Sequence, residues 1–161
     1  MKMTKFVLTA VLSVAALTPG VSSAQSTSGT FNVNITLTSA CTLSAITALD
    51  FAYTSLQVGA QAATGGGLTV SCTNTLPYTF GLQAGNGAAV PPGAATIGPI
   101  TDTAVNLAYS LTRPAGAVGN GLAQAATITG TMAANQAGTC ATASCSNAAA
   151  TNRTHTLIVN F

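Results

Sequence analysis

Two segments of the chain alternate apolar and polar residues with the period of two that is typical of β-strands. Residues 30–37 place on one face Phe31, Val33, Ile35 and Leu37. The last eight residues, 154–161, place on one face Leu157, Val159 and Phe161. The first pattern lies on a polar N-terminal arm, residues 25–40. A strand carried on such an arm suggests β-strand addition to another molecule.

The same period continues through the rest of the chain. It predicts strands at residues 41–46, 49–54, 67–73, 77–83, 104–112, 125–133 and 152–161. Clusters of glycine, proline and asparagine predict turns at residues 65–67, 85–87, 91–93, 98–99 and 119–121. The alanines near the C-terminus predict no helix, because Cys145, Ser146 and Asn147 interrupt them. Short strands with turns at this spacing indicate an all-β sandwich.

The first 24 residues have the pattern of a secretory signal peptide. Lys2 and Lys5 precede an apolar run over residues 6–17, and the small residues Ser22 to Ala24 follow it. We expect cleavage before Gln25, because the apolar run is shorter than the roughly 20 residues that cross a bilayer. The expected parts are thus the signal peptide 1–24, the arm 25–40 and a single domain over 41–161.

Removal of the signal peptide also removes both lysines. The remaining charged residues are Asp50, Asp102, Arg113 and Arg153, so the mature chain has a net charge of zero. Such a chain lacks the basic surface that nucleic acids or acidic membranes require. Its high apolar content and low charge favour a folded domain over a disordered chain.

The four cysteines of an exported chain predict disulfides, for which three pairings are possible. Cys72 ends a strand whose apolar residues face inward, and Cys41 opens the first strand of the domain, so we pair these two. Cys140 and Cys145 then close a small local loop. A metal site made of the second pair with His155 would have only three ligands, in a compartment that oxidises thiols.

At this level the chain resembles the spore coat protein U domain family, which includes the subunits of archaic chaperone-usher pili. The resemblance covers nearly the whole mature chain. It is carried by the order of the first cysteine pair, the strands and the aromatic C-terminus, through residues 41–43, 49–53, 68–73, 77–82 and 107–111.

The resemblance implies an incomplete immunoglobulin-like sandwich, which lacks one strand and exposes a groove beside its C-terminal strand. In related pilins a periplasmic chaperone lends a strand to this groove, and at the outer-membrane usher the arm of the next subunit replaces it. The donor residues here would be Phe31, Val33, Ile35 and Leu37. The strand that borders the groove, and that the chaperone contacts, would carry Leu157, Val159 and Phe161.

The implied function is that of a structural subunit of a surface pilus, exported through the periplasm, which supports adhesion and biofilm formation. Its partners would be the chaperone, the usher and neighbouring subunits in a polymer, with no cofactor, nucleic acid or small-molecule substrate. A single domain favours a shaft or minor subunit over a two-domain tip adhesin.

Three alternatives remain open at the level of the sequence. Residues 31–37 could be the first strand of a self-contained secreted sandwich that acts as a coat or binding protein. The terminal Phe161 also resembles the end of an outer-membrane β-barrel, although seven aromatic residues in the mature chain are few for two girdles. An enzyme is disfavoured, because a triad would need His155 with Asp50 or Asp102 and no nucleophile motif accompanies them.

Overall fold

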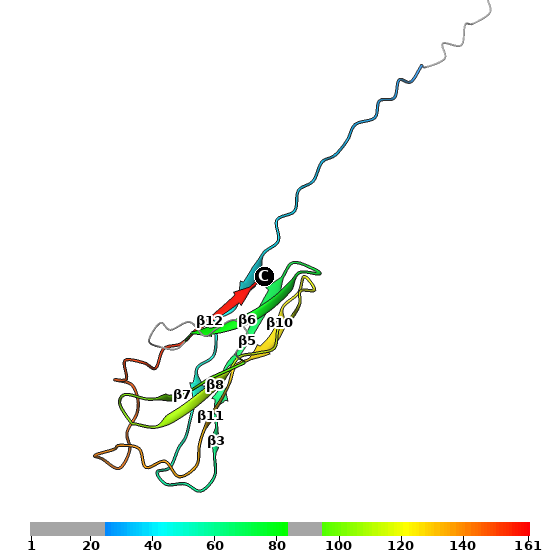
Figure 1. Cartoon of the computed structure of the whole chain (residues 1–161). Helices are drawn as coiled ribbons and strands as arrows, with labels where there is room; N and C mark the ends of the chain where they lie inside the picture. Colours follow the sequence, from blue (N-terminus) through cyan, green and yellow to red (C-terminus); the bar gives the residue numbers. More distant parts are fainter. Residues whose placement is uncertain (1–24, 84–94) are drawn as a thin grey trace, which may run out of the picture. The chain divides into compact units, whose positions relative to one another are not determined.

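The computed structural model describes residues 25–83 and 95–161, so the predicted signal peptide and the turns predicted at 85–87 and 91–93 lie outside the described residues. The described chain divides into a first unit that ends at Thr36 and a second unit, Leu37–Phe161. The described residues are all-β and contain no helix (Figure 1). The strands are β1 (Cys41–Leu43), β2 (Leu49–Asp50), β3 (Gln61–Ala62), β4 (Thr64–Gly65), β5 (Gly67–Cys72), β6 (Pro77–Gln83), β7 (Thr96–Thr101), β8 (Ala108–Thr112), β9 (Ala117–Val118), β10 (Gln124–Thr127), β11 (Thr129–Met132) and β12 (Thr156–Asn160).

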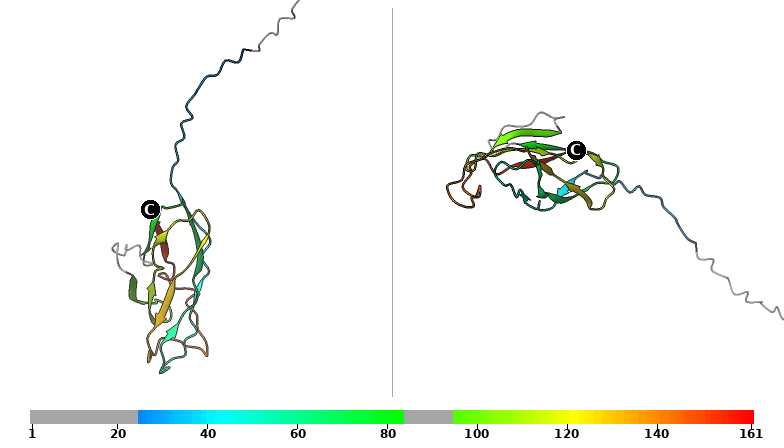
Figure 2. Two further views of the ribbon diagram at one scale, coloured as in Figure 1. Left: turned by 90° about the vertical axis from the view of Figure 1, so that its right-hand side faces the viewer. Right: turned by 90° about the horizontal axis from the view of Figure 1, so that it is seen from below.

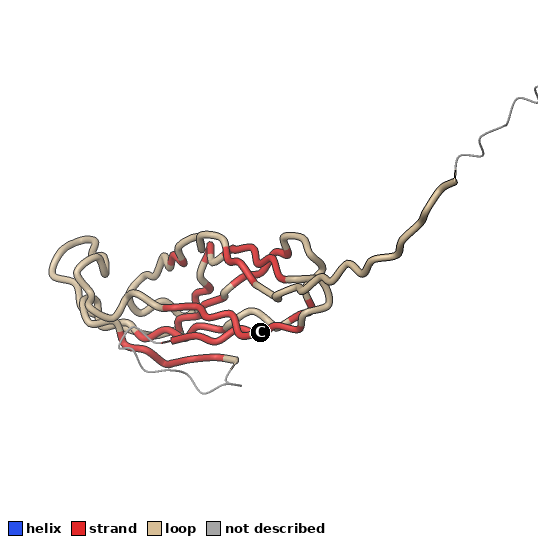
Figure 3. The backbone as a smooth tube through the Cα atoms, turned by 90° about the horizontal axis from the view of Figure 1, so that it is seen from above, coloured by secondary structure: helices blue, strands red, loops and turns tan. Residues whose placement is uncertain are grey.

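The strands of the second unit form antiparallel sheets in the orders β1-β5-β10, β3-β11-β8-β7, β12-β6-β9 and β2-β4. Only Ile128 separates β10 from β11, so these two strands connect the first two sheets as one extended segment. The views in Figures 2 and 3 show the strands stacked in layers, as in an immunoglobulin-like sandwich.

The core lies between these layers and follows the predicted alternation of side chains. In β5 the inward residues Leu68, Val70 and Cys72 are buried, while Thr69 is exposed. The other buried core residues include Tyr78, Phe80 and Leu82 of β6, Tyr109 and Leu111 of β8, Met132 of β11 and Leu157 of β12. Period-two patterns therefore located the central strands correctly.

Both disulfides expected from the sequence are present. Cys41 and Cys72 are directly opposite each other in the β1–β5 ladder, with their Cα atoms 4.1 Å apart. Cys140 and Cys145 close the small loop near the C-terminus, with Cα atoms 5.7 Å apart.

Several predicted elements differ from the observed ones because local side chains compete with the strand. The strand predicted at 104–112 begins only at Ala108. The side chain of Asp102 accepts hydrogen bonds from the amides of Ala104 and Val105 and holds these residues in a turn. The turn predicted at Gly98–Pro99 lies instead inside β7, where the register shifts between Ile97 and Ile100. Because β7 is at the edge of its sheet, it can accommodate a proline and a bulge.

Four strands were not predicted. One is β7, where a turn was expected, and the others are β3, β4 and β9, since two residues give no readable period. Three other predicted strands are shorter in the structure. Of residues 41–46 only Cys41–Leu43 are a strand. Of residues 49–54 only Leu49–Asp50 are a strand, although Phe51 and Tyr53 keep the alternation as half-buried residues. Of residues 152–161 only Thr156–Asn160 are a strand.

The arm, residues 25–40, contains no strand, in contrast to the strand predicted at 30–37. Its apolar side chains are highly exposed: Phe31 85 %, Val33 71 %, Ile35 86 % and Leu37 78 %. An extended segment needs a neighbouring strand to satisfy its backbone groups, so alternation alone does not make a strand of it.

We predict that the two disulfides contribute unequally to stability. Replacing Cys41 and Cys72 together by alanine releases a 32-residue loop and should lower the free energy of unfolding by about 3 to 4 kcal/mol. The matched replacement of Cys140 and Cys145 releases a much shorter loop and should cost about 2 kcal/mol. Urea unfolding of the three mature chains measures both effects. Equal losses for the two pairs would contradict this ranking.

Candidate functional site: an open groove beside the C-terminal strand

A groove of about 730 Å³ opens into the core of the second unit. One bank is formed by residues 46–51 with Tyr53, and the other by residues 153–155 and Leu157. Its floor consists of side chains from β6, β8 and β11 and of Ile128 between β10 and β11. The groove therefore exposes part of the hydrophobic core between the first segment and the last strand of the domain.

The groove is open because β12 is paired on one side only. Its five residues all pair with β6, from Thr156 opposite Gln83 to Asn160 opposite Thr79. Within the described part of the chain, no strand pairs with the other edge of β12. On the opposite bank, β2 pairs with β4 alone. An edge with unpaired amide and carbonyl groups is a template for a further strand.

The central part of the groove is apolar. Its lining includes Leu49, Leu82, Leu111, Ile128 and Leu157. Glycine at position 130 allows the first bank to approach the sheet, because a Cβ there would lie 2.7 Å from Cζ of Phe51 and 3.2 Å from Cδ2 of Leu49. A side chain on β11 at this position would push both residues, and with them the first bank, away from the sheet.

One end of the groove is polar and is built around Asp102, which is only 2 % exposed. Burial raises the pKa of this carboxyl group, but hydrogen bonds from the amides of Val105 and Ala104 and from the Asn147 side chain outweigh it and hold the pKa below its usual value. The Asn147 amide donates to Oδ2 over 3.0 Å. Asp102 is therefore a satisfied, ionised group that fixes the turn before β8.

Next to Asp102, the hydroxyl of Tyr109 lies 2.7 Å from Nε2 of His155. Burial raises the pKa of Tyr109, and the charge of Asp102 raises it further. Burial lowers the pKa of His155, and the backbone of Gln83 opposes this only in part. Nδ1 of His155 is buried, and within the described residues no group satisfies it with a hydrogen bond of ordinary geometry. The neutral ring is therefore the favoured form in the folded domain.

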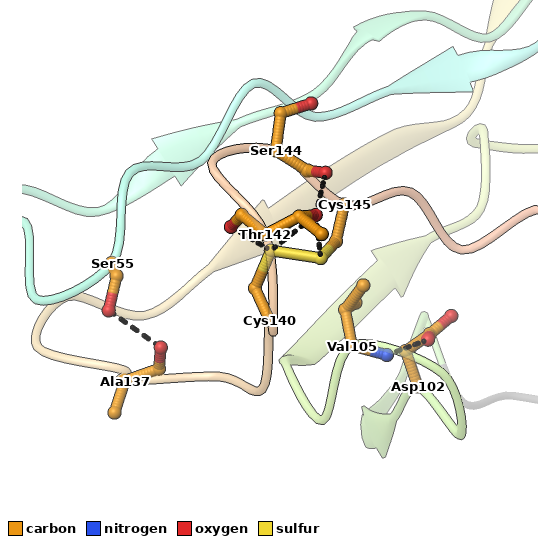
Figure 4. Close-up of a disulfide and its surroundings, with 8 residues drawn as sticks. All are labelled: Ser55, Asp102, Val105, Ala137, Cys140, Thr142, Ser144 and Cys145. Atoms are coloured by element: carbon orange, nitrogen blue, oxygen red, sulfur yellow. Dashed lines mark hydrogen bonds between the residues drawn. A yellow bond between two sulfur atoms is a disulfide. The ribbon is translucent and has the colours of Figure 1, made fainter.

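The loop closed by the second disulfide borders this polar end (Figure 4). Cys145, Ser146 and Asn147 contribute to the groove lining. The segment that follows the loop is anchored through the Asn147 bond to Asp102 and through Asn152, whose side chain donates to the carbonyl of Thr101 at the end of β7 over 2.8 Å. The disulfide loop thus forms one boundary of the groove.

The structure brings some predicted site residues to the groove and leaves others exposed. On β12, Leu157 is buried and lines the groove, and Val159 is half-buried against the core. Phe161, expected on the same face, follows the strand and is 62 % exposed. The structure gives no partner strand for Phe31, Val33, Ile35 and Leu37, which are all exposed.

The polar end was missed by sequence reasoning, which disfavoured both a triad of His155 with Asp102 and a metal site with His155, and expected His155 at the surface or at a rim. Both oxygens of Asp102 are engaged by backbone amides and Asn147, while His155 contacts Tyr109. Among the described residues, no group of three histidine, cysteine or acidic side chains is arranged to hold a metal ion. In the same residues, no helix has the length and apolar character needed to cross a membrane.

The Spore Coat Protein U domain family matches residues 27–159 of the 161-residue chain. The chain belongs to this family, whose domain has an immunoglobulin-like fold and is of the structural pilus or coat type. The matched region includes most of the arm as well as the domain that contains the groove. No curated protein and no solved structure matches the chain.

We predict that His155 makes stability depend on pH near neutrality. Its pKa is lowered in the folded state from 6.5, so the unfolded chain binds the proton first as the pH falls. Stability should be full above that value and should decrease below it until the folded ring itself protonates. Urea midpoints at about pH 7.5 and about pH 5.5 measure this decrease.

The control for this prediction is His155→Asn, which should flatten the dependence between these two pH values. Asp102 does not interfere, because its lowered pKa shifts the loss of its contribution to pH values below 3.8. An unchanged pH dependence in the variant would show that another group is responsible.

Proposed function

We propose that the chain is a structural subunit of a surface pilus that polymerises by donor-strand exchange. In this proposal, residues Phe31–Leu37 of one copy insert beside β12 of the next copy. The observation that carries the proposal is that the arm and the groove of the same chain are complementary. The arm exposes four alternating apolar side chains, and the domain has an open apolar groove beside an unpaired strand edge.

The free-energy terms favour insertion of the arm into an open groove over docking of the arm on the surface of a complete domain. Burying Phe31, Val33, Ile35 and Leu37 gives about 6 to 12 kcal/mol. Ordering the backbone of the eight residues 30–37 costs about 8 to 16 kcal/mol. The two terms nearly cancel, so the net gain comes from covering the groove and from ladder hydrogen bonds to β12, each contributing about 0.5 to 1.5 kcal/mol.

Insertion of the arm into the groove of its own domain is disfavoured by the chain between them. Ala40 already belongs to the β1–β5 ladder, because Thr73 donates its amide to the Ala40 carbonyl over 3.0 Å. A reversal of direction before β1 is left with Thr38 and Ser39. Two-residue hairpin turns need residues that adopt positive φ, such as Asn-Gly, and a β-branched threonine does not fit.

An open groove also requires protection before assembly, since an exposed apolar surface with an unpaired edge promotes aggregation. A periplasmic chaperone that lends a strand to β12 would supply this protection, and an outer-membrane usher would exchange that strand for the arm of the next subunit. Export by the predicted signal peptide, residues 1–24, would bring the chain to this pathway. The resulting fibre would support adhesion and biofilm formation.

We predict that a charge on the inward face of the arm blocks polymerisation. Val33→Asp or Ile35→Asp should abolish fibres on the cell surface and leave the chaperone-bound subunit folded, because a buried carboxylate harms only the junction. Asn34→Asp is the matched control, since it places the same charge on the opposite face of the strand. Fibre by immunoblot and subunit copurified with the chaperone are measured together.

The outcome of this experiment separates exchange from a self-contained sandwich. Loss of fibre with retention of the chaperone complex supports donor-strand exchange. If Val33→Asp and Ile35→Asp destroy both the fibre and the folded subunit, the arm is a core strand of its own domain and the proposal is wrong.

We predict further that β12 is needed for capture by the chaperone. Deletion of Val159–Phe161 removes part of the open edge and moves the terminal carboxylate, which basic chaperone residues would bind, from Phe161 to Ile158. The truncated subunit should no longer copurify with the chaperone and should be degraded in the periplasm. A stable, soluble truncated subunit in a strain without the chaperone would show that the domain completes its own core.

A further inference from the structure

The two ends of the domain carry its most exposed aliphatic side chains. Among the described residues of 41–161, the four highest exposures of large aliphatic residues are Val58 at 91 %, Leu122 at 69 %, Leu56 at 63 % and Val118 at 55 %. Singly scattered exposed aliphatic residues are common, whereas exposed apolar residues that form a contiguous patch mark interaction sites.

These pairs lie at opposite ends of the continuous segment β10–β11 (Figure 1). Val118 ends β9, and Leu122 lies between β9 and β10, so we call this region the Leu122 end. Gln136, which follows β11, accepts a hydrogen bond from the amide of Leu56 over 2.8 Å, so we call this loop the Leu56 end. The two surfaces are separated by the whole length of the paired strands.

The Leu56 end is held in a fixed conformation. The Asn135 amide donates to the Gln57 carbonyl over 2.8 Å, and the Ser55 hydroxyl donates to the Ala137 carbonyl over 2.6 Å (Figure 4). Leu56 itself has φ +59°, a conformation that a branched side chain seldom adopts without a compensating reason. A loop fixed in this way presents Leu56 and Val58 to a partner with little loss of conformational entropy.

The Leu122 end is fixed in a similar way and adjoins the start of the domain. The Thr75 amide donates to the Gly119 carbonyl, and the Gly121 amide donates to the Cys72 carbonyl. Gly119 packs so closely that a Cβ there would lie 2.8 Å from that of Cys72. Because Cys72 is bonded to Cys41, this surface lies where the arm joins the domain.

The polar end of the groove lies on the side of the Leu56 end. The Tyr53 hydroxyl donates to the Ala133 carbonyl over 2.9 Å, and the Thr139 amide donates to the Val105 carbonyl over 2.7 Å. Tyr53 and Val105 also line the groove. The groove therefore extends towards the end of the domain opposite to the one at which the arm begins.

The direction of the arm then decides which surfaces meet. If the arm entered the groove from the Leu122 end, the two domains would meet at the ends from which their arms start. They could then exchange arms reciprocally, which gives a closed dimer. An open fibre requires entry from the Leu56 end. Four residues from Leu37 to Cys41 span at most about 14 Å, so the donor's Leu122 end must lie close to the acceptor's Leu56 end.

We propose that the Leu56 end of each subunit packs against the Leu122 end of the next copy of this chain, as a second contact beside the inserted strand. The inference rests on the proposed donor-strand exchange and adds the partner surface that fixes the angle between subunits. No charged residue lies in 54–59 or 117–122, so both surfaces can be buried without leaving an unpaired charge in the interface.

The test uses fibres assembled from the full chain with paired cysteine substitutions. In Val58→Cys/Leu122→Cys fibres, a short thiol-reactive crosslinker should join neighbouring subunits. Heating in detergent separates uncrosslinked fibres into single subunits, so the crosslinked fibres should still give a ladder of dimers, trimers and longer oligomers on a gel. The matched control is Val58→Cys/Thr69→Cys, in which the second thiol lies on an exposed position of β5 away from both ends. This control should give at least tenfold less crosslinked product.

A second set of variants protects the test against misfolding caused by new thiols. The double variant Val58→Lys/Leu122→Lys should weaken the contact by placing like charges on both surfaces. The double variant Val58→Lys/Leu122→Glu should restore it with opposite charges. Electron microscopy measures the effect as the spread of bend angles between neighbouring subunits. Fibres that form normally but show no specific crosslink and no charge dependence would overturn the end-to-end contact while leaving donor-strand exchange intact. Absence of fibres from the unmodified chain would overturn both proposals.

Discussion

The one-sided pairing of β12 is the constraint on which the rest of this domain depends. Its edge towards β6 is fully paired, and its other edge faces residues 46–53 across an open groove. Because no strand pairs with that edge in the described chain, Leu157 and the floor of the core border open space. A strand that paired with this edge would stabilise the folded domain, since a ligand that binds only the folded state stabilises that state.

The sequence was sufficient to predict central strands that have a partner strand on both sides. In β5 and β6, every second residue is buried, so a period of two could be read directly, and the cysteine at the end of β5 indicated its partner. Prediction failed where the formation of a strand depends on a neighbouring strand and not only on the alternation of apolar and polar residues. The alternation at 49–54 and 30–37 is as regular as in β5, yet only Leu49 and Asp50 have a strand partner in the structure. A sequence shows which face of a strand is apolar, but it does not show whether a neighbouring strand exists.

The polar end of the groove illustrates a different limit. Asp102, Tyr109, Asn147 and His155 come from distant parts of the chain, and none of them belongs to a recognisable motif. The sequence contains one histidine, and neither a catalytic triad nor a metal site around it was favoured by the residue pattern. The structure gives these residues structural tasks, because Asp102 fixes a turn and His155 packs beside Tyr109 at the start of β12. Such tasks leave no signal in residue spacing.

The near absence of charge connects the composition with the proposed assembly. The arm, residues 25–40, and the two end surfaces contain no charged side chain. A junction built from them depends on apolar burial and backbone hydrogen bonds, neither of which is weakened by salt in the way that exposed ion pairs are. A neutral surface, however, provides little charge repulsion between free subunits, so they tend to associate. A chain of this composition would therefore suit the proposed polymer in varied external media, and in that proposal free subunits would need protection until they are assembled.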